Sequence, residues 1–144
     1  MALYLPSSIQ KLMDFIKAVY TSSILVPVVV KPIGAAAQIG VPEAHKLAIK
    51  LGRPFIVLPE VRDLRGVLGC ERVVYVSEAG REVGVEELIA GSVRTALLLG
   101  SGDQEPSGRE IEGLEIAWPR GVPKGMPVTA LAGILVYEIL RIKG

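Results

Sequence analysis

Apolar positions along the chain alternate between the period of a helix and that of a buried strand. Residues 9–20 carry apolar side chains at spacings of three and four, which predicts an amphipathic helix capped by Ser7–Ser8. Residues 25–31 are instead apolar on both sides and rich in valine, as in a strand buried on both faces. Pro27 indicates that this strand begins near it or lies at a sheet edge.

The same alternation continues along the rest of the chain. Pro42 and Gly52 predict the start and end of a second helix, since helices accept proline in the first turn and often end at glycine. Further strands are expected at 3–5, 54–58, 72–77, 93–99 and 114–118, and further helices at 63–68, 85–90 and 126–142. Strands joined by helices predict a mostly parallel sheet covered on both faces. We therefore expect one doubly wound α/β domain over residues 1–144.

Composition narrows the class of protein. Of the 144 residues, 50% are hydrophobic and 22% charged, which excludes a disordered chain. No apolar run reaches the ~18–20 residues of a membrane span, and no secretory leader is visible. One cysteine, Cys70, forms neither an internal disulfide nor a zinc site. We expect a soluble, cytoplasmic protein without a metal, and the absence of asparagine suggests a thermophile.

Charge is distributed with a mild asymmetry. Residues 1–72 hold nine lysines and arginines against five acids, and residues 73–144 hold seven against ten. A strongly basic nucleic-acid-binding protein usually has a larger excess of positive charge. Any contact with RNA is therefore expected to be local or to be assembled across an oligomer.

Three loops at the expected carboxyl edge of the sheet differ from ordinary connections: residues 32–40, 100–108 and 119–127. Ligands bind at this edge in open parallel sheets. The second loop, GSGDQEPSG, combines glycines, which allow close approach of the backbone to a ligand, with Asp103 and Glu105. Its spacing matches neither GxGxxG nor a phosphate-binding loop. A solvated turn is the alternative interpretation of this loop.

The predicted last helix is apolar on nearly every side from Val128 to Ile139. A helix of this kind has to be covered all round, and one sheet face cannot do that. We expect it to pack into its own domain and against a second subunit, with Ala132 and Gly133 allowing close approach. An ordinary buried core helix fits the same periodicity.

The segments LLLGSGDQEPSG and GMPVTALAGILVYEILR, joined by a short strand and a Pro/Gly-rich loop, resemble the C-terminal half of the SpoU-type SPOUT RNA methyltransferases. The stretch from Leu131 to Arg141 matches best, and the resemblance covers about residues 93–144. It implies a C-terminal trefoil knot, an exception to the rule against knots. It also implies an S-adenosylmethionine cofactor and a homodimer formed through the last helix. The chain is most similar to a small archaeal branch, some members of which carry a nuclease label.

Before residue 93 the chain departs from the family's pattern. The segment PIGAAAQIG resembles the first motif, Asn-x-Gly-x-x-x-Arg, and Gly34 matches its glycine. Pro32 replaces the asparagine and Gln38 the arginine. In the family that arginine is thought to assist removal of the ribose 2′-hydroxyl proton, so its replacement bears on catalysis more than on the fold.

The resemblance implies that backbone groups of the late loops hold the cofactor. The expected cofactor-binding residues are Leu99, Gly100, Ser101, Ala117, Pro119, Gly121, Met126 and Val128. Gln38, Asp103 and Arg120 are the expected catalytic residues, and Glu105 is a further group able to orient the acceptor. Arg120 would supply positive charge to a phosphate or to the reacting oxygen.

Three functions remain open from the sequence. The first is a homodimeric methyltransferase that modifies tRNA or rRNA, at the ribose 2′-oxygen. The second is a catalytically altered knotted dimer that binds RNA or an adenosine cofactor without methylating, which the replaced arginine favours. The third is a flavodoxin-like or Rossmann-like nucleotide-binding domain without a knot. It would need a phosphate loop after the first strands, and PIGAAAQIG matches one poorly.

Overall fold

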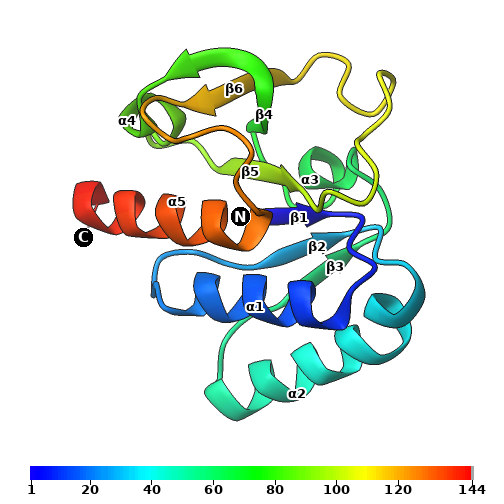
Figure 1. Cartoon of the computed structure of the whole chain (residues 1–144). Helices are drawn as coiled ribbons and strands as arrows, with labels where there is room; N and C mark the ends of the chain where they lie inside the picture. Colours follow the sequence, from blue (N-terminus) through cyan, green and yellow to red (C-terminus); the bar gives the residue numbers. More distant parts are fainter. Residues whose placement is uncertain (144) are drawn as a thin grey trace.

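Strands and helices alternate along the chain, as Figure 1 shows for the computed structural model, which describes residues 1–143. The strands are β1 (Ala2–Tyr4), β2 (Val28–Val30), β3 (Ile56–Leu58), β4 (Arg72–Val83), β5 (Thr95–Gly100) and β6 (Glu115–Pro119). The helices are α1 (Ile9–Tyr20), α2 (Val41–Leu51), α3 (Asp63–Gly66), α4 (Val85–Leu88) and α5 (Val128–Lys143), with a π-helix, η1 (Ala36–Gly40). Over residues 1–143, no helix is both long and apolar enough to cross a membrane.

All six strands form one parallel sheet in the order β3-β2-β1-β5-β4-β6. The chain runs outward from β1 through β2 to β3, and then returns to build the other half of the sheet beside β1. Leu3 thus lies opposite Val29 on one side and Leu99 on the other. This confirms the predicted doubly wound α/β fold. Strand order and register do not show whether the chain passes through one of its own loops, so the trefoil knot stays a prediction.

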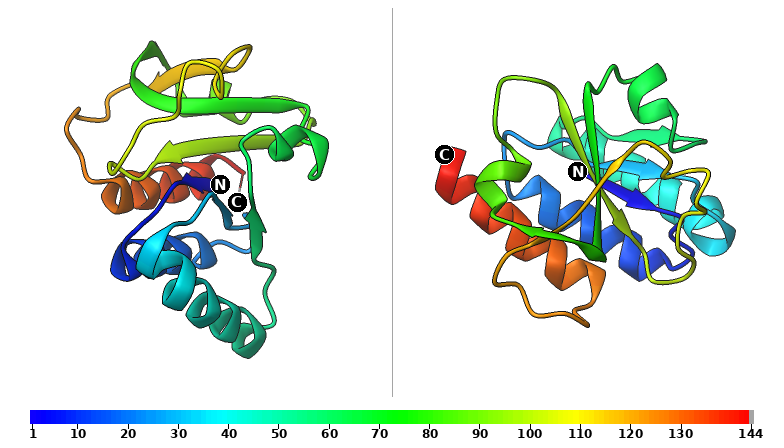
Figure 2. Two further views of the ribbon diagram at one scale, coloured as in Figure 1. Left: turned by 90° about the vertical axis from the view of Figure 1, so that its right-hand side faces the viewer. Right: turned by 90° about the horizontal axis from the view of Figure 1, so that it is seen from above.

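Helices lie on both faces of the sheet (Figure 2), and alternating side chains of the strands pack into a separate layer on each face. Leu3, Val29 and Leu99 pack against α1, α2, α4 and α5 on one face. Tyr4 and Leu98 point to the other face, which α3 and the segment 101–114 cover. Burial on both faces explains why the strands lack the apolar–polar alternation of a half-exposed sheet.

The ends of α1 and α2 lie where the sequence indicates. The Ser8 hydroxyl accepts a hydrogen bond from the Lys11 backbone N–H at 3.1 Å, which satisfies one free donor of the first turn of α1. Gly52 ends α2 with a φ of 64°, a left-handed conformation that glycine adopts without steric cost. Both boundary predictions are confirmed.

One expectation needs correction. The region 32–40 is not all loop, because residues 36–40 form η1 and continue into α2; a Cβ on Gly40 would lie 2.7 Å from Leu12 Cδ2. Of the two positions that Pro27 allowed, the structure has the strand start, since Pro27 precedes β2 and β2 is interior to the sheet. The last helix packs against its own domain on one side, while Tyr137 is 59% exposed. Packing of the exposed side against a second subunit stays a prediction.

Strand β4 continues beyond the predicted end at Ser77 and passes close to β6. Its pairing with β6 shifts register between Val76 and Arg81, so residues 77–80 form an irregular segment. Gly80 lies in this segment, and a Cβ added there would meet the backbone of β6, 2.5 Å from the carbonyl carbon of Ile116 and 2.7 Å from Ala117 Cα. Backbone atoms cannot yield as a flexible side chain can, so this crossing requires glycine.

Replacing Gly80 with alanine should therefore destabilise the protein by roughly 2 kcal/mol, the usual scale for overpacking a well-packed site. The free energy of unfolding from urea denaturation measures the change. Gly66→Ala is the matched control, because a Cβ at Gly66 meets no atom within 4 Å. Equal stability of the two variants would contradict the close crossing.

Candidate ligand-binding site

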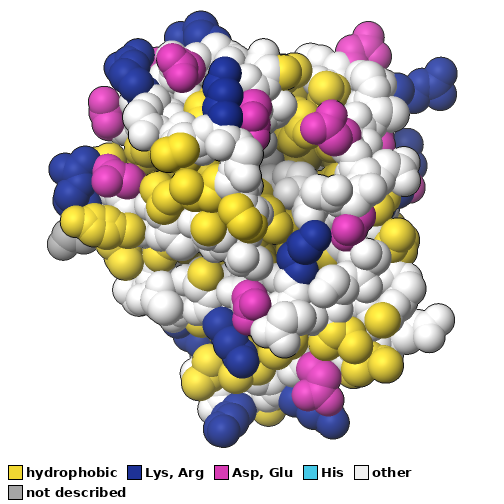
Figure 3. Space-filling model, viewed as in Figure 1, with side chains coloured by type: hydrophobic (Ala, Val, Ile, Leu, Met, Phe, Trp, Pro, Cys, Tyr) yellow, Lys and Arg dark blue, Asp and Glu magenta, His cyan; other side chains and the backbone are white. Residues whose placement is uncertain are grey.

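A cavity of about 840 Å³ opens at the carboxyl edge of the sheet, where the strand order reverses between β1 and β5. Parallel α/β sheets bind ligands at such a switch point. The lining of this central cavity comprises Ser8, Gln10, Lys11, Asp14, residues 75–79, residues 100–102, Glu105, Trp118, residues 126–129 and Leu131. In the space-filling view a hollow lies at this place, beside apolar side chains over α5 (Figure 3).

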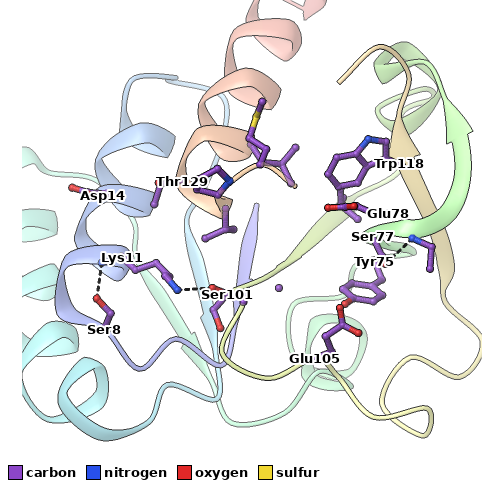
Figure 4. Close-up of a pocket in the computed structure, with 18 of the residues that line it drawn as sticks. Ser8, Lys11, Asp14, Tyr75, Ser77, Glu78, Ser101, Glu105, Trp118 and Thr129 are labelled. Atoms are coloured by element: carbon purple, nitrogen blue, oxygen red, sulfur yellow. Dashed lines mark hydrogen bonds between the residues drawn. The ribbon is translucent and has the colours of Figure 1, made fainter. Parts of the chain in front are cut away.

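One wall of the central cavity is formed by the start of α1 and presents Lys11 (Figure 4). Its ammonium group donates a hydrogen bond to the Ser101 carbonyl at 2.7 Å and lies 3.5 Å from the Asp103 carboxylate. Asp103 also accepts hydrogen bonds from the backbone N–H and hydroxyl of Ser7, at 3.3 and 2.9 Å. The connection after β1 is thus joined to the connection after β5.

The opposite wall is formed by β4 and β6, with Tyr75, Ser77, Glu78 and Trp118 (Figure 4). The Trp118 indole N–H donates to the Val122 carbonyl at 2.9 Å, which fixes its ring. A Glu78 carboxylate oxygen accepts from the Gly125 N–H at 2.8 Å. Glu78 therefore fastens the loop before α5 to the irregular segment of β4.

Tyr75 stays protonated at neutral pH. Burial raises the pKa of its hydroxyl, and the nearby carboxylate of Glu105 raises this pKa further, against a smaller opposing hydrogen bond with Ser77. A Cβ on Gly100 would lie 3.7 Å from the Tyr75 hydroxyl oxygen. The hydroxyl therefore lies beside the end of β5, where it is a neutral hydrogen-bonding group for a ligand.

A second carboxylate fixes the far part of the segment 101–114. Glu110 accepts hydrogen bonds from the Tyr4 hydroxyl at 2.7 Å, the Ser107 N–H at 3.0 Å and the Lys31 ammonium at 3.2 Å. Lys31 has a φ of 54°, which is unusual outside glycine, and it directly follows β2. The segment beside the cavity is thus held by Asp103 at one end and by Glu110 at the other.

The two anchoring carboxylates both remain ionised well into the acid range. Burial acts to raise the pKa of Asp103, but the hydrogen bonds from Ser7 and the charge of Lys11 outweigh it and lower this pKa. Burial likewise acts to raise the pKa of Glu110, and the hydrogen bonds from Ser107, Tyr4 and Lys31 outweigh it. Each carboxylate is therefore better stabilised in the folded chain than in the unfolded one.

The residues expected to bind the cofactor divide into two groups. Gly100, Ser101, Met126 and Val128 line the central cavity. Leu99, Ala117 and Pro119 are buried beside it without lining it, and Gly121 is exposed in a turn with a φ of 85°. Of these β6 residues and their neighbour Trp118, Trp118 is the one that lines the cavity.

The residues expected to be catalytic are not brought together. Asp103 lies at the rim through its contacts with Lys11 and Ser7. Gln38 is exposed in η1 and Arg120 is exposed after β6, and neither lines the cavity. Glu105, expected to orient the acceptor, does line it. The roles given to these residues stay predictions.

Sequence reasoning missed Lys11, Tyr75 and Glu78. The periodicity places Lys11 on the polar side of a helix. The signal that could have indicated a site is that Lys11 follows shortly after the end of a strand. The segment PIGAAAQIG, compared above with the family's first motif, follows β2, whereas the cavity is lined by the connection after β1. Among residues 1–143, no group of three or more His, Cys, Asp or Glu side chains is placed to hold a metal ion.

The fold is similar to that of methyltransferases of the SpoU and TrmH type. A probable methyltransferase from Bordetella pertussis has a TM-score of 0.69 and 15% identity, covering 96% of this chain and 89% of that one. The SpoU methyltransferase AviRb from Streptomyces viridochromogenes, solved with AdoMet, has a TM-score of 0.67 and 17% identity, covering 99% of this chain and 60% of that one. The TrmH/SpoU tRNA modifying enzyme from A. aeolicus has a TM-score of 0.61 and 17% identity, covering 97% of this chain and 72% of that one. At such identities the likeness establishes the fold alone.

The chain belongs to the family described as "RecB-family nuclease (DUF2122)", whose model matches residues 34–138. It is also 36% identical over 137 residues to a protein of Aeropyrum pernix named "Putative type II restriction enzyme ApeKORF2002P". That match covers 94% of this chain and 88% of the relative. The family's description and the fold therefore point to different chemistry.

Acid should weaken the fold through the two anchoring carboxylates. Because their pKa values are lowered in the folded chain, their stabilisation is present above about pH 4 and is lost as pH falls through the lowered values. We expect the temperature of half-unfolding of the wild type to decrease when the pH is lowered below about pH 4. The double variant Asp103→Asn, Glu110→Gln should show a much smaller decrease over the same pH range. Glu43→Gln, which changes an exposed carboxylate, is the control. A wild-type midpoint no more acid-sensitive than the double variant would contradict the two anchors.

Proposed function

We propose that this protein is an S-adenosylmethionine-dependent methyltransferase that modifies the ribose 2′-oxygen of tRNA or rRNA. The observation that carries the proposal is the central cavity, which lies at the switch point of a SPOUT-type sheet and is lined by the loops after β5 and before α5. AviRb, of similar fold, is described in complex with AdoMet, and the A. aeolicus protein as a tRNA modifying enzyme.

The lining of the central cavity fits such a cofactor. A volume of about 840 Å³ lies within the ~300–1,000 Å³ of typical ligand sites. Trp118, Val128 and Leu131 offer apolar surface for an adenine ring, while the backbone of Gly100 and Ser101 offers polar groups. When bound, S-adenosylmethionine supplies an already activated methyl group, so the protein mainly has to position the acceptor.

Lys11 is the residue best placed to act on the acceptor. Its ammonium group faces the cavity and is held by the Ser101 carbonyl and the Asp103 carboxylate. A fixed positive charge there stabilises the negative charge that develops on the acceptor oxygen as its proton leaves. Asp103 is then a positioning residue, and Glu105 is the carboxylate that accepts the proton. In this proposal Lys11 takes the part that the family assigns to an arginine in its first motif.

Two other functions are weighed against this one. The description of the family favours a nuclease, which would cleave a nucleic acid chain instead of methylating it. The exposed position of Gln38, where an arginine was expected, favours a protein that binds an adenosine cofactor or RNA without transferring a methyl group. The cofactor titration and the transfer assay separate all three.

The first test is titration of the protein with S-adenosylmethionine, followed by transfer of labelled methyl to bulk tRNA and rRNA. We expect roughly micromolar affinity at about one site per chain. Lys11→Met should reduce transfer by about 100-fold or more while changing cofactor affinity much less, because the charge acts on the developing oxyanion. Lys17→Met, on the exposed side of the same helix, should transfer normally.

The remaining outcomes each select one function. Cofactor binding without transfer to any RNA would favour the binding protein. Absence of binding together with cleavage of DNA or RNA in the presence of Mg²⁺ would favour the nuclease. Full activity of Lys11→Met would contradict the role given to Lys11 and leave the methyltransferase proposal standing.

We also propose that the chain is a single knotted domain and a homodimer through α5. The outer side of α5 presents Gly133, Tyr137 and Leu140 to an open groove of about 520 Å³ that continues to Thr21 of the α1 end. Apolar side chains gather over this helix beside the hollow (Figure 3). Exposed apolar patches of this kind are typical of interfaces between proteins.

Introducing a charge into the α5 face should therefore dissociate the dimer. We expect Tyr137→Glu to lower the mass measured by light scattering from that of a dimer to that of a monomer, since a buried unpaired carboxylate is costly. Ile49→Glu is the matched control, because Ile49 is 81% exposed on α2, away from this face. A dimeric Tyr137→Glu variant, or a monomeric wild type, would contradict the proposed interface.

A further inference from the structure

Carboxylates outnumber basic groups around the central cavity. On the α1 wall the ammonium group of Lys11 lies 3.5 Å from Asp103, and Asp14, which accepts a hydrogen bond from Gln10 at 2.8 Å, also lines the cavity. The β4–β6 wall contributes Glu78, with Glu105 from the loop after β5 beside Tyr75 (Figure 4). Within residues 1–143, neither Glu78 nor Glu105 forms an ion pair with a basic side chain. The cavity therefore has an excess of negative charge, and the β4–β6 wall has no basic group to offset its share.

The acidic side also holds the two aromatic residues of the cavity, Tyr75 and Trp118 (Figure 4). Aromatic faces attract organic cations, and nearby carboxylates add to that attraction. The position of Glu78 is fixed, because one of its oxygens accepts the Gly125 N–H at 2.8 Å. A carboxylate of fixed position and an aromatic wall therefore face a cavity that is large enough for a nucleoside.

We infer that this wall selects a nucleoside ligand with a positively charged substituent, and that the site therefore prefers the sulfonium of S-adenosylmethionine to the neutral thioether of S-adenosylhomocysteine. The inference rests on the proposed function, and it names the charge interaction by which the site would select its ligand. The same field disfavours adenosine ligands that carry phosphate. Loss of the positive charge on methyl transfer then weakens binding of the product and assists its release.

Calorimetric titration of the full chain with three ligands tests this inference. The ligands are S-adenosylmethionine, S-adenosylhomocysteine and adenosine 5′-monophosphate, each at low and at high ionic strength. We expect about tenfold tighter binding of the sulfonium than of the thioether at low salt, and the weakest binding for the phosphate. High salt should reduce the preference, because the mouth of the cavity is open to screening ions.

The variant Glu78→Gln, Glu105→Gln removes both charges while keeping side-chain oxygens, so residue 78 can still accept the Gly125 N–H. We expect this variant to bind the two sulfur ligands with nearly equal affinity, mainly through weaker binding of the sulfonium. Glu112→Gln removes a charge from an exposed position outside the cavity and should keep the wild-type preference.

Equal affinities in the wild type, or a preference that survives in the double variant, would overturn the inference and leave the methyltransferase proposal intact. Failure of all three ligands to bind would overturn both. Tighter binding of the monophosphate than of the sulfonium would overturn the charge assignment and indicate a nucleotide-binding protein.

Discussion

The backbone of β1 pairs with β2 on one side and with β5, far along the chain, on the other, and the position of the cavity depends on this second contact. Parallel pairing sets the carboxyl ends of β1 and β5 side by side, so the connections that follow them meet. Lys11 consequently reaches Ser101, and Asp103 reaches Ser7. Separation of these strands would divide the sheet and remove the cavity.

Three carboxylates order the loops around this switch point, and each does so by accepting hydrogen bonds from a different element. Asp103 joins the loop after β5 to Ser7 and to Lys11 of α1, Glu110 joins the same loop to β1 and to Lys31 after β2, and Glu78 joins the loop before α5 to β4. Loops of this length gain order only when such contacts offset the conformational entropy that is lost. The loops around the cavity are therefore held in place by contacts within the chain.

The family's description and the structural neighbours name different activities, and a shared fold does not decide between them. The chemistry of the site carries more weight: a cation held against the sheet edge, a neutral Tyr75, and a wall of Trp118 and Glu78. In the proposed function, a charged nucleoside ligand would bind with its reacting group between the two walls. The surface of α5 where we propose the homodimer contact is exposed and partly apolar.

The sequence by itself determined the secondary-structure elements. Apolar periodicity set α1, glycine set the end of α2 and the β-branched runs set the buried strands, because each depends on neighbours a few residues away. The positions of Lys11 and Gln38 relative to the cavity were decided only by the tertiary structure. Lys11 lies on the polar side of its helix, and pattern alone cannot distinguish that from a solvated position; pairing of β1 with β5 turns it into a cavity residue. Gln38 matched a motif in spacing but follows β2, because position at a sheet edge depends on strand order, a non-local property that residue spacing does not contain.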